Sequence, residues 1–291
     1  MKVCNNCPRA CGVTREGDNI GYCRVGNKPI ICRAEPHYWE EPCICGENGS
    51  GTVFFGGCNL RCVYCQNAKI SCGNSGKEVS ESELCDIYLD LQRRGVCNIN
   101  LVTPTPWTDS IKASLDLAWQ KGLYLPTVYN CGGYESVDTL KGLRGYIGIY
   151  LPDFKYLSPS LAKKYSHAEN YPETAKKALY EMVDQRPSAV YNSENLMVKG
   201  VIVRHLVLPS HTEESVEVIE YLHKEYGDSI VLSIMSQYTP MPWAEGELKR
   251  TLYEHEYKQV VDHARSIGIK NAYIQDGKSA ESSFIPEFNM K

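Results

Sequence analysis

Six short runs of β-branched and aromatic residues recur along this chain with helix-like stretches between them, and this alternation is the strongest constraint on its fold. The runs are TVFF (52–55), INLV (99–102), PTVY (126–129), YIGIYL (146–151), VIVRHLVL (201–208) and SIVLSIM (229–235). Runs of this kind predict strands, and strands separated by helices pair in parallel, because a parallel pair needs a long crossover. The pattern therefore predicts an α/β fold with helices outside a parallel sheet, either open or curved into a partial barrel.

The clearest helical pattern begins at Ser80. Glu83 stands three residues later, as in a capping box, and Gly95 ends the pattern. Apolar residues recur between them at helical spacing: Leu84, Ile87, Tyr88 and Leu91. Further helices are predicted within 109–121, 136–143, 172–186, 213–227 and 252–268. These helices fill the gaps between the predicted strands.

The charge of the chain is nearly balanced, with 31 Lys and Arg against 35 Asp and Glu. A net charge of -4 gives no electrostatic case for binding nucleic acid or an anionic membrane. No apolar run approaches the length of a membrane span, and MKVCNNCPRACG lacks the apolar core of a signal peptide. The expected compartment is the cytoplasm, with no nucleic-acid and no membrane partner.

Cysteine is abundant and unevenly placed: ten of the fourteen cysteines lie before residue 66 and four lie after it. A long chain with no signal peptide is expected to keep its thiols reduced, so metal binding is a better interpretation than a disulfide framework. The asymmetry predicts two parts. Residues 1–50 are expected to form a cysteine-rich metal-binding segment, and residues 51–291 the α/β body.

The sharpest cysteine motif is FFGGCNLRCVYCQN (54–67), which follows the first predicted strand. Its cysteines, Cys58, Cys62 and Cys65, fall in the loop after that strand, where parallel α/β folds carry their reactive groups. Gly56 and Gly57 let the backbone turn sharply there. Three thiolates can hold three irons of a four-iron cluster and leave the fourth free to bind a small molecule, as a catalytic zinc site keeps one open position. The alternatives are zinc with a distant fourth ligand, or unpaired core thiols.

This motif resembles the cluster-binding loop of radical S-adenosylmethionine enzymes, in the branch related to pyruvate formate-lyase activating enzyme. The resemblance extends over nearly the whole chain. Its further matches are LPTVYNCGGYE, IYLPDFKY, VIVRHLVLPSHTEES, LSIMSQYTP and YIQDGKSAESSFIPEF. It implies a partial (β/α)6 barrel with a cysteine-rich N-terminal extension. It also implies a 4Fe-4S cluster on the three cysteines, which reduces S-adenosylmethionine to a 5′-deoxyadenosyl radical that abstracts a substrate hydrogen.

The resemblance assigns further residues to cofactor binding. Lys155 would pair with the methionine carboxylate and Asp153 would accept ribose hydroxyl bonds or bind a cation; the alternative is a solvated pair on a surface turn. Arg204 lies within an apolar strand, so it is expected to meet a carboxylate, to extend to the strand edge or, as the resemblance favours, to contact the cofactor. The other residues assigned to the cofactor are Tyr64, Thr103, Thr105 and Asn130.

The chain departs from the family pattern in two places. After the second predicted strand, LVTPTPW replaces the Gly-Gly-Glu that holds the methionine amino group, so Thr103 and Thr105 would supply hydroxyl or carbonyl acceptors without a carboxylate. After the third, Asn130 and Cys131 stand where the activating enzymes have an Asp-Thr pair of a monovalent-cation site. That cation site is therefore in doubt.

A second metal site is predicted near the N-terminus. Its four candidate ligands are Cys4, Cys7, Cys11 and Cys23. Four thiolates suit a closed zinc site or a second iron-sulfur cluster, and the sequence does not choose between the two. Cys43 and Cys45 either join this site or are incidental. Cys85 and Cys97 are expected to be small buried hydrophobic residues.

The resemblance implies a protein glycine as substrate, and hence a glycyl-radical enzyme as partner, with an electron donor such as flavodoxin or ferredoxin. A second hypothesis is radical chemistry on another peptide or on a small molecule. A third, from a different class, is a non-enzymatic electron carrier or zinc-dependent binding module. Binding of S-adenosylmethionine would separate the first two hypotheses from the third.

Overall fold

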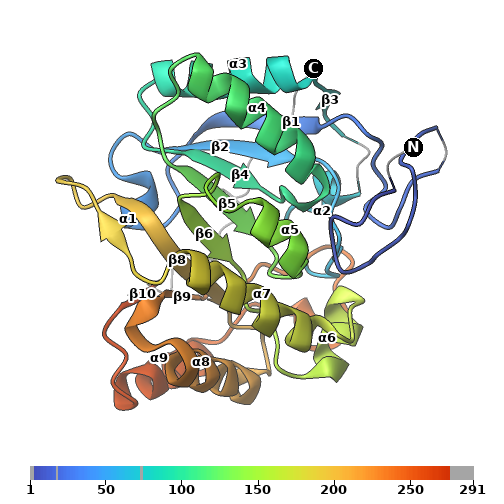
Figure 1. The fold of residues 1–291 in the computed structure, drawn as a ribbon. Helices are drawn as coiled ribbons and strands as arrows, with labels where there is room; N and C mark the ends of the chain where they lie inside the picture. The colour runs from blue at the N-terminus through green and yellow to red at the C-terminus, as the bar shows by residue number, and fades with distance from the viewer. Residues whose placement is uncertain (1–2, 18, 73–74, 276–291) are drawn as a thin grey trace.

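The computed structural model describes residues 3–17, 19–72 and 75–275 and is built around a sheet (Figure 1). The strands follow the order β10-β9-β8-β6-β5-β4-β2-β1-β3, and β7 pairs with β8. They are β1 (Ile30–His37), β2 (Ser50–Phe55), β3 (Lys77–Glu78), β4 (Ile99–Val102), β5 (Thr127–Cys131), β6 (Ile149–Pro152), β7 (Val190–Tyr191), β8 (Met197–Leu206), β9 (Val231–Met235) and β10 (Ala272–Ile274). Most of the YIQDGKSAESSFIPEF motif lies outside the described residues.

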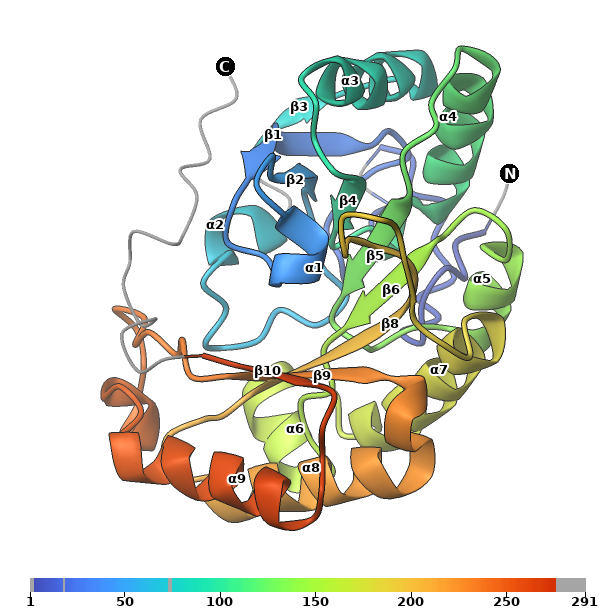
Figure 2. The same cartoon turned by 90° about the vertical axis from the view of Figure 1, so that its left-hand side faces the viewer.

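The helices connect these strands. They are α1 (Pro42–Cys45), α2 (Ala68–Ser71), α3 (Glu81–Arg93), α4 (Thr108–Gln120), α5 (Val137–Gly142), α6 (Pro159–Ser166), α7 (Tyr171–Gln185), α8 (Thr212–Tyr226) and α9 (Glu254–Ser266), with short 3-10 helices η1 (Thr105–Trp107), η2 (Gly227–Ser229) and η3 (Gly246–Lys249). Helices α4, α5 and α7 cover one side of the sheet, whereas the short α1 and α2 lie on the other (Figure 2).

All six predicted strand runs form strands, and these strands are parallel. They are β2, β4, β5, β6, β8 and β9, and β10 extends the parallel set beyond β9. Among the described residues β10 and β3 stand at opposite ends of the strand order, so the barrel is open. The predicted partial barrel of β/α units is confirmed.

Helix α3 shows how the local sequence determines an element. Ser80 caps it: the Ser80 hydroxyl accepts from the Glu83 amide at 3.2 Å, and the Glu83 carboxylate accepts from the Ser80 amide at 2.8 Å. Leu84 and Tyr88 on its inner face are fully buried. Gly95 follows with φ of +81°, a conformation that glycine adopts without strain. The predicted start and end of this helix are therefore confirmed.

Strand β1 is an element that the sequence did not reveal. It pairs antiparallel with β2, from Ile31 opposite Phe55 to His37 opposite Ser50. Ile31 and Cys32 on this strand are buried in the core. The N-terminal residues therefore contribute a strand that lies between β2 and the short β3 in the sheet. The expected division of the chain at residue 50 stays a prediction.

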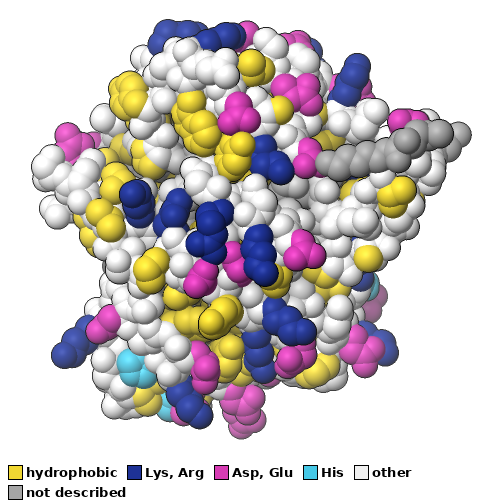
Figure 3. Space-filling model, in the orientation of Figure 1, with side chains coloured by type: hydrophobic (Ala, Val, Ile, Leu, Met, Phe, Trp, Pro, Cys, Tyr) yellow, Lys and Arg dark blue, Asp and Glu magenta, His cyan; other side chains and the backbone are white. Residues whose placement is uncertain are grey.

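The outer face over α4, α5 and α7 carries a band of Lys and Arg side chains with acidic side chains between them (Figure 3). Such mixed charge is typical of the solvent side of amphipathic helices. Within residues 3–275, apart from the short gaps at 18 and 73–74, no helix is both long and apolar enough to cross a membrane.

Candidate functional site

The carboxyl ends of the parallel strands line a pocket of about 230 Å³. Most of the residues predicted for the site contribute to its wall: Cys58, Cys62, Tyr64 and Cys65 after β2, Thr103 after β4, Asn130 on β5, Asp153 and Lys155 after β6, and Arg204 on β8. Their sequence positions span much of the chain, and the parallel sheet brings them to one edge.

The loop that carries the three cysteines is anchored at several points. The Trp107 indole donates to the Gly56 carbonyl at 3.0 Å, and the Gly57 amide donates to the Ile70 carbonyl at 2.8 Å. Further along, the Val63 amide donates to the Tyr165 carbonyl at 2.8 Å. The loop is thus tied to η1, α2 and α6 before any ligand is bound.

The three thiols suit an iron-sulfur cluster in their chemistry. Burial raises the pKa of Cys58 to about 11 and also raises the pKa of Cys65, and the neighbouring Cys62 adds to both shifts. Bound iron would offset that cost, because a coordinating thiol is deprotonated by the metal charge. The Cys62 sulfur lies 2.9 Å from the Ser166 hydroxyl, a contact of the kind that tunes cluster ligands.

No group of three or more His, Cys, Asp or Glu side chains in the described ranges is gathered as around a single metal ion. The thiolates of a four-iron cluster bind different irons and therefore stand farther apart than ligands of one ion. Asn67, which also lines the pocket, has a buried side-chain oxygen without a hydrogen-bond partner. A pocket with three soft thiol donors on one loop, a fourth cysteine (Cys131) in its wall and an unsatisfied polar atom fits a bound cluster and cofactor.

Asp153 and Lys155 form a close pair in the pocket wall. The Lys155 ammonium lies 2.6 Å from the Asp153 carboxylate, and the side chains are 16% and 29% exposed. Burial lowers the pKa of Lys155, but Asp153 and then Cys62 outweigh it and hold that pKa well above its usual value. The Tyr171 hydroxyl accepts from the Lys155 amide at 3.0 Å. The pair is therefore more enclosed than the solvated-turn alternative requires, while its contact with a cofactor stays a prediction.

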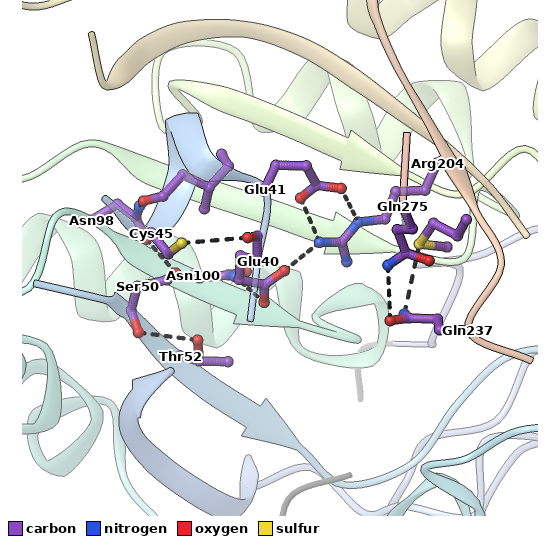
Figure 4. A network of polar contacts seen from close by, with 12 residues as sticks. Glu40, Glu41, Cys45, Ser50, Thr52, Asn98, Asn100, Arg204, Gln237 and Gln275 are labelled. Carbon is purple, nitrogen blue, oxygen red and sulfur yellow. Dashed lines mark hydrogen bonds and ion pairs between the residues drawn. The ribbon is translucent and has the colours of Figure 1, made fainter. Parts of the chain in front are cut away.

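Arg204 meets carboxylates, one of the outcomes expected for a guanidinium on an apolar strand. It donates to Glu41 from Nε at 2.8 Å and from Nη2 at 2.6 Å, and Nη2 also donates to Glu40 (Figure 4). Burial favours the neutral form of Glu41, but Arg204 holds its pKa below the usual value. Glu40 also accepts from Asn100 at 2.9 Å. Arg204 and Glu40 line the pocket, and the role of Arg204 toward a cofactor stays a prediction.

Sequence reasoning missed Glu40 and Glu41. They follow β1, which was not predicted, and they lie 164 and 163 positions before Arg204 in the sequence. The adjacent acidic residues in HYWEEPC were the available signal, but a surface location is the ordinary expectation for such a pair. Their burial at the pocket appears only once β1 is placed beside β2.

Thr103 and Asn130 lie side by side at the strand ends. The Thr103 amide donates to the Asn130 carbonyl at 2.9 Å, and Thr103 has a φ of +58°. A positive φ is unusual for a β-branched residue and is typical of functional loops. Tyr64 is buried in the pocket wall, where its hydroxyl lies 2.6 Å from the hydroxyl of Tyr156.

Thr105 lies elsewhere. Its hydroxyl donates to the Glu135 carboxylate at 2.8 Å, and the pocket lining does not include it. Glu135 is buried and also accepts from the Tyr129 hydroxyl at 3.0 Å. Burial raises the pKa of Glu135 to about 7. Thr105 thus satisfies a buried carboxyl behind the pocket, and this geometry gives no support to its assignment to the cofactor.

The four N-terminal cysteines, all among the described residues, border one small cavity, although no three of them are gathered as around a single metal ion. A small cavity of about 20 Å³ is lined by Cys4, Cys7, Cys11 and Cys23. The Tyr22 amide donates to the Cys11 sulfur at 3.4 Å. Soft donors of this kind suit a thiophilic metal, but their arrangement in the described residues is not that of a site around one ion, so the second metal stays a prediction.

Cys43 and Cys45 lie apart from that cavity. Cys43 packs with apolar residues such as Ile149, and the Cys45 thiol donates to the Glu40 carbonyl at 3.3 Å. Cys85 is fully buried on α3, and the half-buried Cys97 donates to the Cys45 carbonyl at 3.2 Å. These thiols therefore serve the packing of the body.

Comparison with known proteins matches residues 44–125 to the model of a 4Fe-4S single cluster domain, which includes the three-cysteine loop. An uncharacterised protein of Methanocaldococcus jannaschii is 28% identical over 289 residues, covering 94% of this chain and 77% of that protein. Streptococcus suis SuiB superimposes with a TM-score of 0.50 and 13% identity, both bound to S-adenosylmethionine (75% of this chain, 48% of that chain) and bound to precursor peptide SuiA (74% and 46%). The protein anSMEcpe with bound AdoMet gives a TM-score of 0.51 and 13% identity (73% and 58%).

The structural comparisons establish the fold, and residues 44–125 match the model of a 4Fe-4S single cluster domain. At such low identity the structural likeness shows the partial barrel alone, and this chain spans about half the length of the solved structures. The matched cluster domain and the shared barrel agree with the expected radical S-adenosylmethionine superfamily.

Proposed function

We propose that this chain is a radical S-adenosylmethionine enzyme that abstracts a hydrogen atom from its substrate. The observation that carries the proposal is the convergence of Cys58, Cys62 and Cys65 with the Asp153–Lys155 pair on one pocket at the strand ends. When bound, the 4Fe-4S cluster supplies the electron that cleaves S-adenosylmethionine reductively. A non-enzymatic electron carrier or a zinc-dependent binding module would not need an iron with an open position. It would also not need polar side chains that converge on the same pocket.

The residues of the pocket have separate roles in this proposal. The three thiolates hold three irons and leave one coordination position for the cofactor. Lys155 pairs with the methionine carboxylate, and Asp153 keeps the ammonium charged and fixed in place. Thr103 and Asn130 supply polar groups where the Gly-Gly-Glu and Asp-Thr elements of the family are missing.

The proposed substrate is a backbone glycine of a glycyl-radical enzyme, with flavodoxin or ferredoxin as electron donor. The resemblance to the activating enzymes supports this choice. SuiB is seen bound to a precursor peptide in one structure and to S-adenosylmethionine in another, so a protein of this fold binds both kinds of molecule. Radical modification of another peptide or of a small molecule is the second candidate, because the cysteine loop specifies how a radical is made and not where it goes.

A labelling experiment tests the glycine substrate. The reduced enzyme and S-adenosylmethionine are mixed with a candidate glycyl-radical enzyme, preferably one encoded nearby, that carries deuterated glycine. We expect deuterium in 5′-deoxyadenosine and a glycyl-radical resonance on the partner, because the abstracted hydrogen comes from the glycine α carbon. A partner labelled on alanine is the control and should give unlabelled product. Unlabelled deoxyadenosine with every candidate partner would favour the second candidate chemistry.

The Lys155→Ala variant tests the cofactor pocket. We expect S-adenosylmethionine binding to weaken by roughly 1 to 3 kcal/mol, because one charge-assisted hydrogen bond is lost, while the iron content stays that of the wild type. Calorimetry gives the affinity. The matched control is Lys163→Ala on α6, where the lysine pairs with Glu169 at the surface. Equal affinities in Lys155→Ala and wild type would contradict the assignment of Lys155.

We also propose that Cys4, Cys7, Cys11 and Cys23 hold a second metal, either zinc or an iron-sulfur cluster. The cavity they share supports a common site. With four thiolates such a site would be closed, and a closed site has a structural role.

A further inference from the structure

The N-terminal arm, residues 3–17 and 19–25, packs directly against the three-cysteine loop. Arg9, between Cys7 and Cys11, donates from Nε to the Asn59 carbonyl at 2.8 Å. Its other nitrogens donate to the carbonyls of His167 at 2.7 Å and Ser166 at 3.4 Å. One guanidinium therefore joins the loop to the end of α6.

Tyr22, adjacent to Cys23, makes the second connection. Its hydroxyl donates to the Leu60 carbonyl at 3.1 Å, one residue beyond the carbonyl that Arg9 holds. The guanidiniums of Arg9 and Arg61 each lie 3.9 Å from the centre of the Tyr22 ring. Cation–π contacts of this kind attract each guanidinium to the face of the ring. Arg61 is itself a loop residue, with a φ of +58°.

The arm also fills the space at the start of the loop. A Cβ atom on Gly57 would lie 2.9 Å from the Cys23 carbonyl and 2.5 Å from the Val25 side chain. Val25 is 1% exposed, so this contact belongs to the core. The loop is thus enclosed from Gly57 to Arg61 by residues that flank the N-terminal cysteines.

The contacts of Arg9 and Tyr22 also involve residues next to the cysteines of the loop. Ser166, whose carbonyl accepts from Arg9, places its hydroxyl 2.9 Å from the Cys62 sulfur. Asn59 and Leu60, whose carbonyls are held by Arg9 and Tyr22, lie between Cys58 and Cys62. The arm therefore constrains the backbone that sets the separation of two cluster ligands.

We propose that the N-terminal arm is a metal-organised clamp that shapes the three-cysteine loop before the cluster arrives, with Arg9 and Tyr22 as its positioning residues. A metal held by the four arm cysteines would fix the chain on both sides of Arg9 and next to Tyr22. Preorganising the loop lowers the conformational cost of binding the cluster. The inference rests on the proposed function for the identity of the cluster that the loop binds. The contacts between the arm and the loop do not depend on that function.

Hydrogen exchange in the full-length, cluster-free protein tests the clamp. In Arg9→Gln and Tyr22→Phe, the amides of residues 59–65 should exchange roughly tenfold or more faster than in the wild type, because each variant loses a hydrogen bond that restrains the loop. Arg93→Gln is the control, since Arg93 is an exposed residue of α3 that pairs with Asp90. Unchanged exchange at 59–65 in both clamp variants would overturn the proposal.

Two further variants test whether a metal organises the arm. The triple Cys58→Ala, Cys62→Ala, Cys65→Ala protein should keep its N-terminal metal by elemental analysis, which also identifies it as zinc or iron. Cys11→Ser should lose that metal and show the same faster exchange of residues 59–65. A triple variant without metal, or a Cys11→Ser protein with unchanged exchange, would overturn the role of the metal.

Reconstituted protein adds a spectroscopic readout. The reduced cluster of Arg9→Gln should give an altered paramagnetic spectrum and release iron faster than that of Arg93→Gln, while the N-terminal metal content stays equal. An identical spectrum and rate would overturn the clamp. A wild type that takes up no cluster would refute the proposed function, and the cluster-free exchange data would still decide the clamp.

Discussion

Alanine in place of Cys58, Cys62 or Cys65 is expected to abolish reductive cleavage of S-adenosylmethionine. The wild type, made and reconstituted without oxygen, should be brown, and each variant should lose that colour and fall to the background rate of cleavage. The reason is the number of ligands: the loop offers three thiolates, and a cluster left with two loses a protein ligand. The fourth cysteine of the pocket wall, Cys131, is buried on β5, and burial holds the pKa of its thiol well above the usual value. Iron analysis and product chromatography measure both effects.

Cys72→Ala is the matched control, because Cys72 is a half-buried cysteine just beyond α2 and does not line the pocket. It should keep the wild-type iron content and cleavage. Urea unfolding of the cluster-free proteins separates a lost ligand from a lost fold. Wild-type cleavage in any one of the three loop variants would remove that cysteine from the assigned set.

The strand and helix pattern was sufficient to predict the body of the fold. Strand-like runs separated by long helices favour parallel pairing, because each helix can serve as the crossover, and parallel strands deliver their carboxyl ends to one edge. This is why Asp153 and Arg204, some fifty residues apart in the sequence, could both be expected near Cys58 without any knowledge of their contacts. Local signals such as the Ser80 capping box determined helix ends.

The partners of these residues could not be predicted, because they depend on long-range packing. Arg204 is satisfied by Glu41, which lies 163 positions earlier in the sequence. Glu41 follows β1, whose sequence IICRAEPH contains charged residues and a proline that obscure strand periodicity. Placing a buried ion pair requires knowing where both partners lie, since burying a charged carboxylate without its cation is costly.

Thr105 shows that two residues close together in the sequence can have different partners. Its position two residues after Thr103 suggested a shared role, but η1 turns the chain and directs Thr105 to Glu135. A buried carboxyl needs hydrogen-bond donors, and Thr105 and Tyr129 both supply one. The sequence does not show which hydroxyl faces a cofactor and which satisfies a core acid.

Gly133→Ala is expected to destabilise the fold and to disturb the cofactor site together. Gly133 has a φ of +78°, and a Cβ there would lie 2.1 Å from the Asp153 carbonyl and 2.8 Å from the Tyr171 hydroxyl. The positive φ and the overpacking should together cost about 2–5 kcal/mol of unfolding free energy. Because Asp153 and Tyr171 hold Lys155, the backbone shift should also weaken S-adenosylmethionine binding.

Gly145→Ala separates these two causes. Gly145 has a φ of +91°, but a Cβ there meets no atom within 4 Å, so alanine adds backbone strain without a clash. Its expected cost is about 1–2 kcal/mol, with cofactor affinity unchanged. Urea unfolding and calorimetry on both variants give the comparison. The two variants could lower the unfolding free energy equally, with Gly133→Ala keeping the wild-type affinity for S-adenosylmethionine. That result would show that the close approach of the loops after β5 and β6 does not set the position of Lys155.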